Sequence, residues 1–284
     1  MPQRRRDAEP DKYLNGKKNK LTALLRSYGS TLVAYSGGVD SMLLALMAKE
    51  VLGDRCLAVT AVSPIHSTQE VETARALARK FGIRHLVIRS RELKSPAFKA
   101  NPVSRCYLCK KMLFEQITAL AKRRGINTVI DGSNADDLKA YRPGLKALKE
   151  LKIKSPLAEA GLTKNEIRQM AKQKGIPAWN APANSCLATR VPYGTAITSK
   201  MLKQAESSEQ TLHLMGFSQC RVRHHGELAR LEILPEEFGK VLRSKDKIII
   251  SLRRAGYKFI ALDLAGYQSG CFDYQTNDGK NGKR

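Results

Sequence analysis

The sequence predicts an α/β protein, with a doubly wound parallel sheet followed by a smaller α+β domain. Three observations support this class. Over the first 180 residues, short hydrophobic segments alternate with helical patterns, which is typical of parallel strands joined by crossover helices. Beyond Thr198 the order changes to helix, two strands, helix and strand. The chain has 284 residues, 42% of them hydrophobic, which is enough to bury a substantial core.

The first strand, residues 31–35, follows a short helix expected around residues 19–28 and leads into a loop of sequence S-G-G-V-D-S. A glycine pair between a strand and a helix lets backbone N–H groups approach an anion, and the helix N-terminus adds partial positive charge. The Gly-Lys-Ser/Thr ending of the Walker loop is absent. The loop resembles the signature of the PP-loop ATP pyrophosphatases, which cleave ATP between its α and β phosphates. The resemblance implies that ATP is bound by Ser36, Gly37, Gly38, Asp40 and Ser41.

The next elements continue the alternation. Strands are expected at 56–62, 85–89 and from 128, and capping boxes at Ser67 and Thr163 open two of the helices. Ligands of such sheets bind at the carboxyl ends of the strands, where Asp131 follows its strand. Asp131, with Asp136 and Asp137 after it, is a candidate for holding Mg²⁺ on ATP, although these residue types also form turns and caps.

Two cysteine segments are candidates for chemistry. Cys106-x-x-Cys109 precedes a helix expected at 112–124, and the helix N-terminus and the neighbouring basic residues Arg105, Lys110 and Lys111 favour thiolates. The spacing fits a redox pair, half of a zinc site, cluster ligands or two unrelated thiols. Cys186 lies in a Pro-rich segment near Arg190, where a thiolate nucleophile, a metal ligand and a small buried side chain are all consistent with the sequence.

The last part of the chain predicts a helix at 199–215, strands at 220–225 and 229–234, a helix at about 236–255 and a strand at 257–264. Arg221 and Arg223 alternate with Val222, so both leave one face of their strand. Two guanidinium groups on one face favour a phosphate or carboxylate clamp, and the alternative is an exposed basic face.

Charge and segment composition set the remaining expectations. The net charge of +24 favours polyanionic partners, either nucleic acid or small molecules with phosphate and carboxylate groups. The apolar runs are much shorter than a membrane span, so we expect a soluble cytoplasmic protein. The predicted organisation is a disordered basic arm at 1–17, a nucleotide-binding domain at 18–180, a small α+β domain at 181–272 and a disordered tail at 273–284.

Taken together, these segments resemble the LarE family of ATP-dependent sulfur transferases over residues 19–272. The family converts carboxylates of pyridinium-3,5-biscarboxylic acid mononucleotide into thiocarboxylates for the nickel-pincer nucleotide cofactor. The segments that carry the resemblance, besides the phosphate loop, are 141–146, Cys186 to Arg190 with 192–194, 221–223, 229–232, and 262–264 with 266–270. Gln268 stands where the family often has Arg, and Thr189 replaces a frequent Ser.

The resemblance implies a mechanism in which ATP adenylylates a substrate carboxylate and a sulfur nucleophile displaces AMP. In that family the residue at the Cys186 position carries the sulfur, and members with one such Cys surrender their own sulfur. Cys106, Cys109 and Cys186 together resemble a three-cysteine branch whose members hold a 4Fe-4S cluster. The resemblance further implies a homo-oligomer, with the sulfur donor unidentified, and substrate binding by Arg190, Glu209, Arg221 and Arg223.

Three other functions compete with this one. A PP-loop tRNA thiolase would use the same cysteine chemistry, and the net charge favours nucleic acid, but no RNA-binding module is recognised. An ammonia-using synthetase has no use for three cysteines. A carrier of iron-sulfur or zinc that merely retains the fold would not need the intact Ser36, Asp40 and Ser41.

Overall fold

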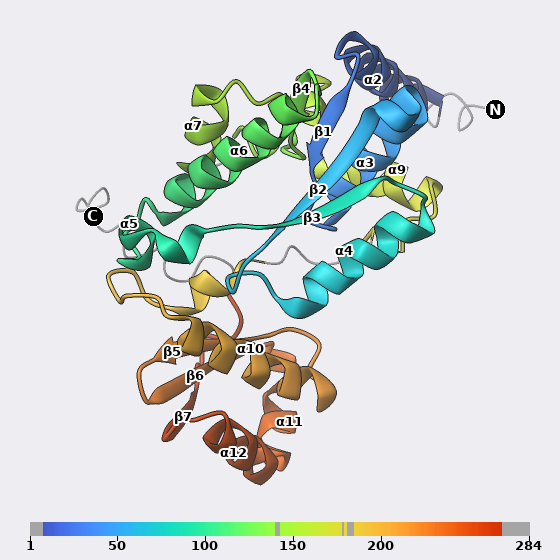
Figure 1. Cartoon of the computed structure of the whole chain (residues 1–284). Coiled ribbons are helices and arrows are strands. Elements are labelled where there is room, and N and C mark those ends of the chain that lie inside the picture. Colours follow the sequence, from blue (N-terminus) through green and yellow to red (C-terminus); the bar gives the residue numbers. More distant parts are fainter. Residues whose placement is uncertain (1–7, 140–142, 178, 181–184, 269–284) are drawn as a thin grey trace, which may run out of the picture. The chain divides into compact units, whose positions relative to one another are not determined.

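The computed structural model describes residues 8–139, 143–177, 179–180 and 185–268. Contacts divide the chain into two compact units (Figure 1). Unit 1 comprises 1–63, 68–92 and 106–184, and unit 2 comprises 64–67, 93–105 and 185–284. Unit 2 therefore includes two segments from the first half of the chain, besides its C-terminal part. The functional division at residue 180 stays a prediction.

Unit 1 contains the parallel sheet. Its elements are α2 (Ala8–Ser27), β1 (Thr31–Ala34), α3 (Val39–Leu52), η1 (Gly53–Arg55), β2 (Cys56–Val62), α4 (Thr68–Lys80), β3 (His85–Arg89), α6 (Arg105–Arg123, whose first residue belongs to unit 2), β4 (Thr128–Ile130), α7 (Pro143–Glu150), α8 (Pro156–Glu159) and α9 (Lys164–Gln173). The short helix η2 (Glu92–Lys94) crosses the boundary in sequence, with Glu92 in unit 1 and the next two residues in unit 2. The strand order is β3-β2-β1-β4, and Thr31 pairs with both Cys56 and Thr128.

Helices cover both faces of this sheet. Val33 of β1 and Ala58 of β2 belong to a core shared with α2, α3, α4 and α9. Their neighbours Leu32 and Val59 point the other way, into a core shared with α6 and α7. This alternation follows from the two-residue period of a strand. The predicted doubly wound parallel sheet is confirmed.

Helix α2 is longer than the sequence indicated. Residues 8–17, assigned to a disordered arm, belong to a helix that begins at Ala8. Two long-range contacts explain its extent: Leu14 is buried in the core, and the Lys17 ammonium forms an ion pair with Glu166 of α9 at 2.8 Å. Neither contact can be inferred from the polar composition of the segment itself.

Unit 2 contains a three-stranded mixed sheet of order β5-β6-β7, in which β5 and β6 are antiparallel and β6 and β7 parallel. Its elements are α5 (Pro96–Lys99), η3 (Leu187–Arg190), α10 (Ser199–Leu214), β5 (Cys220–His225), β6 (Leu228–Ile233), η4 (Pro235–Glu237), α11 (Phe238–Arg243), α12 (Lys245–Arg254) and β7 (Phe259–Leu262). The helix predicted at 236–255 is thus divided, with a break at Ser244, whose N–H still bonds Lys240. The small α+β unit is confirmed.

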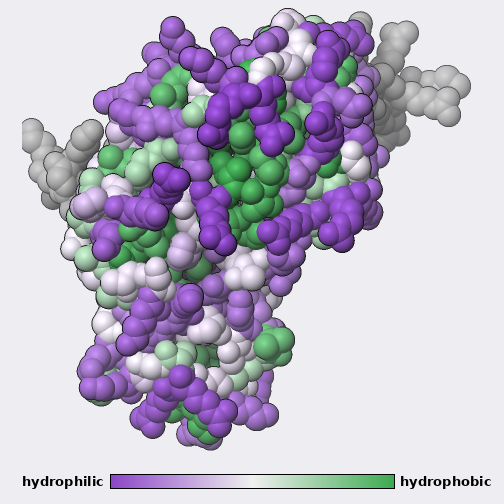
Figure 2. Space-filling model, in the orientation of Figure 1, coloured by the Kyte–Doolittle hydropathy of each residue, from purple (hydrophilic) through white to green (hydrophobic). Residues whose placement is uncertain are grey.

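Hydrophilic side chains cover most of the face seen in Figure 2, with hydrophobic ones gathered between α6 and α4. There the edge strand β3 is half-buried along Leu86, Val87 and Ile88. Within the described ranges, no helix is both long and apolar enough to cross a membrane. Several residues of the segments discussed above lie outside the described residues, namely Tyr141, Arg142, Ser269, Gly270, the arm at 1–7 and the tail at 273–284.

Candidate active site

The phosphate loop of unit 1 joins β1 to the N-terminus of α3. Gly37 has a φ of +80°, and a Cβ there would lie 2.9 Å from the Cβ of Ala74, so both conformation and space require glycine. Gly38 is the N-cap of α3 and has no side chain to bond the first N–H groups of this 14-residue helix. The helix start is therefore suited to an anion.

Hydroxyl groups fix the shape of this loop. The Ser41 hydroxyl donates to the carbonyl of Gly38 at 3.0 Å and lies 3.1 Å from the Ser36 hydroxyl, which accepts from the Gly38 N–H at 3.3 Å. A Cβ on Gly132 would lie 3.0 Å from the Ser41 nitrogen. The loop after β4 thus packs directly against the start of α3, which brings Asp131 to the same edge of the sheet.

Each predicted carboxylate of this edge has partners. Asp40 bonds the ammonium of Lys164 in α9. Asp131 is buried and accepts from the hydroxyls of Ser133 at 2.6 Å and Ser155 at 2.5 Å. The Lys110 ammonium lies 3.7 Å from its Oδ2. Asp131 is therefore an acceptor held in place from three directions.

Asp136 and Asp137 have local roles instead. Asp137 accepts from the Asn134 N–H, and Asp136 accepts from the Lys164 N–H at the start of α9. Both bonds are those of a turn or a helix N-terminus, which agrees with the simpler interpretation of these aspartates. Within the described ranges, no group of three or more His, Cys, Asp or Glu side chains is arranged to hold a metal ion.

Sequence reasoning did not single out Lys110, Gly132, Ser155 or Lys164. Only Lys164 had a usable signal, because the Thr163 capping box places it at the first position of α9, and the structure confirms that box. Lys110 follows Cys109, and its aliphatic stem passes where a Cβ on Gly144 would lie, 2.6 Å from its Cδ. The absence of a side chain at Gly144 of α7 therefore provides the space through which the Lys110 side chain reaches Asp131.

Helix α6 begins at Arg105, seven residues earlier than expected, so Cys106 and Cys109 lie within its first turns. Three residues apart, they share one side of the helix. Cys106 is exposed and Cys109 half-buried. The Lys111 ammonium lies 3.7 Å from Glu150, and Lys110 pairs with Asp131, so both neighbouring ammonium groups have carboxylate partners.

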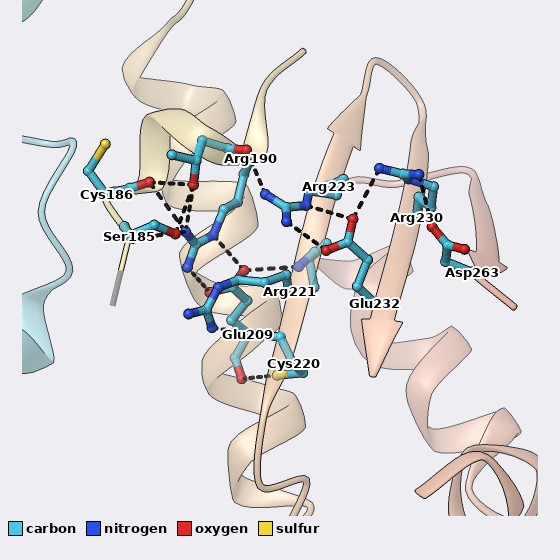
Figure 3. Close-up of polar contacts among 12 residues, drawn as sticks. Ser185, Cys186, Arg190, Glu209, Cys220, Arg221, Arg223, Arg230, Glu232 and Asp263 are labelled. Carbon is cyan, nitrogen blue, oxygen red and sulfur yellow. Dashed lines mark hydrogen bonds and ion pairs between the residues drawn. The ribbon is translucent and has the colours of Figure 1, made fainter. Parts of the chain in front are cut away.

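In unit 2, Cys186 is the N-cap of η3, and arginines bind the backbone of this turn (Figure 3). Arg190 is 4% exposed and donates to the carbonyls of Ser185 at 2.9 Å and Cys186 at 3.2 Å. Arg223 donates to the carbonyl of Thr189 at 2.7 Å. Figure 3 shows the Cys186 sulfur projecting away from these guanidinium groups. The turn is held through its backbone while its sulfur faces elsewhere.

Both arginines are also paired with buried carboxylates. Arg190 donates to both oxygens of Glu209, at 2.8 and 2.9 Å, and Arg223 to both oxygens of Glu232, at 2.9 and 2.6 Å. Arg230 extends the second pair by bonding Glu232 and Asp263. Such bidentate ion pairs hold the planar guanidinium group in one orientation.

Arg221 differs from these two. It is buried and donates to the Cys220 carbonyl at 2.7 Å, and its guanidinium lies 5.3 Å from the centroid of the Tyr267 ring. Burial lowers the pKa of Arg221, and so does the charge of Arg190 beside it, with Glu209 opposing both. Because Arg221 and Arg223 are both buried, the alternative of an exposed basic strand face is excluded.

The Thr189 hydroxyl closes the turn that carries Cys186. It donates to the Cys186 carbonyl at 2.8 Å and lies 3.1 Å from the Ser185 hydroxyl. The other cysteines of the described part are unlike Cys186: Cys56 and Cys220 are buried, and burial raises their pKa values to about 11 and about 12. They remain protonated thiols at neutral pH.

The amino-acid sequence is similar to those of known proteins that bear on this site. Residues 14–102, which contain the phosphate loop, match the NAD synthase family. The chain is 35% identical over 255 residues to the pyridinium-3,5-bisthiocarboxylic acid mononucleotide synthase of Lactiplantibacillus plantarum, covering 89% of this chain and 92% of the relative. The chain belongs to the LarE family.

The chain is also similar to two further proteins. The uncharacterized protein slr1717 of Synechocystis sp. is 42% identical over 257 residues, which cover 89% of this chain and 96% of that protein. Argininosuccinate synthase of Pyrococcus furiosus is 30% identical over 162 residues, covering 51% of this chain and 39% of that enzyme. The similarity to synthases of different products supports an enzyme built on an ATP-using PP-loop domain.

Proposed function

We propose that the protein is an ATP-dependent sulfurtransferase that converts a carboxylate of pyridinium-3,5-biscarboxylic acid mononucleotide into a thiocarboxylate. The observation that carries the proposal is the Cys186 turn of unit 2, whose backbone is fixed by buried arginines while its sulfur projects away from them. The choice of substrate is supported by similarity to a pyridinium-3,5-bisthiocarboxylic acid mononucleotide synthase, which covers 89% of this chain.

In the first step, a carboxylate oxygen of the substrate attacks the α phosphorus of ATP, and pyrophosphate leaves. The phosphate loop, Ser36, Gly37, Gly38 and Ser41, binds the phosphates through the start of α3. Asp40 and Asp131 would hold Mg²⁺ on ATP, a metal that proteins commonly bind through one or two carboxylates together with substrate phosphates. The Lys164 ammonium, which bonds Asp40, would add a positive charge beside the phosphates.

In the second step, a sulfur nucleophile attacks the acyl carbon of the adenylate, the C–O bond to AMP breaks, and a thiocarboxylate forms. Cys186 carries the sulfur. Cys106, Cys109 and Cys186 are the residues that would hold a 4Fe-4S cluster. The accessible thiols of Cys106 and Cys109 on one helix side fit this use, whereas Cys56 and Cys220 do not. Such a cluster, held by three thiolates, would supply a replaceable sulfide as the nucleophile.

Among the arginines, Arg221 is the residue that takes the substrate phosphate. Arg190 and Arg223 already donate to Glu209 and Glu232 in two-pronged pairs, whereas Arg221 has a carbonyl and an aromatic ring as its neighbours. Glu209 then acts by orienting Arg190. Replacing Arg221 by Lys should raise the KM for the mononucleotide by about tenfold, because a lysine cannot bind phosphate with two parallel bonds.

The experiment measures AMP release from ATP by anaerobically purified protein, with the mononucleotide in one reaction and bulk tRNA in another. We expect AMP release with the mononucleotide alone. The Cys186→Ala variant should still release AMP without forming a thiocarboxylate, whereas Asp131→Asn should do neither. Thiocarboxylate formation by Cys186→Ala at the normal rate would exclude the proposed role of this residue.

The tRNA arm tests the second candidate, a tRNA thiolase, which the net charge of +24 favours. AMP release with tRNA alone would reassign Arg221 and Arg223 to RNA phosphates and overturn the mononucleotide as substrate. Iron content and turnover test the cluster: Cys106→Ala and Cys109→Ala should lose iron and stop after one product per chain. We also expect a homo-oligomer, which light scattering measures, and the sulfur donor is unidentified.

A further inference from the structure

Two distant segments of unit 2, 64–67 and 93–105, bond the segment that carries Cys186. The Leu187 N–H donates to the carbonyl of Ile65 at 2.8 Å. The Gly194 N–H donates to the carbonyl of Asn101 at 2.9 Å, and the Ile197 N–H donates to that of Lys99 at 2.8 Å. The Cys186 turn is therefore supported by chain that lies some 90 to 120 residues earlier in the sequence.

Asn101 is the centre of this support. It is fully buried, and its φ of +56° lies in the left-handed region, which asparagine adopts more readily than most side-chain-bearing residues. Its amide nitrogen donates to the carbonyls of Val191 at 3.3 Å and Pro192 at 2.8 Å. A buried side chain with both amide hydrogens directed at the end of the turn orders that end in one conformation.

Arg105 reaches the middle of the same turn. Its Nη1 donates to the Asn101 side-chain oxygen and to the carbonyl of Ala188 at 2.9 Å, and its guanidinium lies 4.8 Å from the centroid of the Tyr193 ring. The side chain is 3% exposed, and no carboxylate of the described residues forms an ion pair with it. A buried cation without a carboxylate destabilises a fold, so its retention here calls for another explanation.

We propose that Asn101 and Arg105 are positioning residues for Cys186, holding the 186–192 backbone so that the sulfur is presented in one orientation. This inference rests on the proposed role of Cys186 in sulfur transfer. The two residues complete a set of side chains that bind successive carbonyls of the turn. Arg190 binds Ser185 and Cys186, Arg105 binds Ala188, Arg223 binds Thr189, and Asn101 binds Val191 and Pro192.

The test follows Cys186 itself. The full-length chain is treated with iodoacetamide, and the alkylation rate of the Cys186 peptide is measured by mass spectrometry in Asn101→Gly and Arg105→Lys. Glycine accepts the left-handed φ, so the first variant removes only the side chain. Lysine keeps the charge of Arg105 but lacks its planar fork. We expect the alkylation rate to rise about fivefold or more in both, because reagent access follows local opening of the turn.

Tyr257→Phe is the matched control. It removes a buried hydroxyl 3.1 Å from the Nδ1 of His224 in the same unit, a contact that involves no carbonyl of the turn, and it should change the Cys186 rate by less than about twofold. Hydrogen exchange of the amides at 187–191 should speed up in the two test variants alone. Rates of alkylation and exchange equal to those of the unmodified chain in a folded Asn101→Gly protein would overturn the proposal, even if Arg105→Lys failed to fold.

Measurements of thiocarboxylate formation distinguish this proposal from the proposed sulfurtransferase function on which it rests. If the unmodified protein forms thiocarboxylate, both test variants should lower kcat and leave the KM for ATP unchanged, since ATP binds in unit 1. A raised KM for ATP with unchanged kcat would contradict a positioning role. If the unmodified protein forms no thiocarboxylate while both variants still accelerate alkylation, the proposed function fails and the control of the Cys186 turn stands.

Discussion

The pairing of Arg190 with Glu209 makes a quantitative prediction. Glu209→Gln keeps the shape of the side chain but removes the charge that compensates Arg190, and both side chains are less than 10% exposed. Breaking such a buried pair costs roughly 3–5 kcal/mol, because a desolvated cation is left behind. Domains are stable by only about 5–15 kcal/mol, so unit 2 should lose a large part of its stability.

Urea denaturation measures this loss, with hydrogen exchange in β5 reporting on unit 2. For a unit of this size the denaturant slope is roughly 1 kcal/mol per molar urea, so the midpoint should fall by about 3 M or more. The single tryptophan, Trp179, packs against the core of unit 1, and its fluorescence transition should change little. Glu206→Gln, on the same helix but half-buried, is the matched control and should cost less than about 1 kcal/mol.

A Glu209→Gln protein as stable as the unmodified chain would refute the reasoning, since Arg190 would then have no need of a buried carboxylate. Unchanged stability combined with a raised KM for the mononucleotide would assign Arg190 to substrate binding. A loss of stability without a change in KM would leave it as a support of the Cys186 turn.

Gly37→Ala should abolish AMP release and lower the stability of unit 1 by about 1–3 kcal/mol, because the new methyl group would meet Ala74 at 2.9 Å in a strained conformation; normal ATP turnover by this variant would contradict the proposed loop. Iodoacetamide at pH 8 should label Cys56 and Cys220 far more slowly than the accessible cysteines, since burial raises their pKa values, and peptide mass spectrometry would reveal the opposite order. Burial and, next, the charge of Arg75 lower the pKa of His85, so the folded state binds its proton less readily than the unfolded state. The stability that His85 contributes should be present above about pH 6.5 and be lost as the pH falls below it, and His85→Gln should flatten that part of the curve.

Local patterns in the sequence predicted much of this fold. The boundaries of β5 at Cys220 and His225 agree with the prediction, and the Thr163 capping box starts a helix as expected, because both depend on residues close in sequence. The early start of α2 and the break at Ser244 were missed. The first depends on an ion pair between residues 149 apart, which leaves no local trace.

The candidate site follows the same rule. The phosphate loop could be identified from six consecutive residues, whereas Lys164 beside Asp40 and Lys110 beside Asp131 could not, because each partner comes from a different element. The alternation of Arg221 and Arg223 correctly put both on one strand face. The alternation did not indicate that Arg223 forms an ion pair with Glu232 on the neighbouring strand, because contacts across strands depend on their register.

The Cys186 turn is held by its carbonyl groups, and every residue type has the same carbonyl. The support is therefore indifferent to which side chain stands at position 186, and it would persist if that side chain were shortened, oxidised or stripped of its sulfur. If Cys186 carries the sulfur as proposed, the turn would keep its conformation through chemical changes at that side chain. Restoring the sulfur atom would then be enough to restore the residue, because the backbone around it would not have to refold.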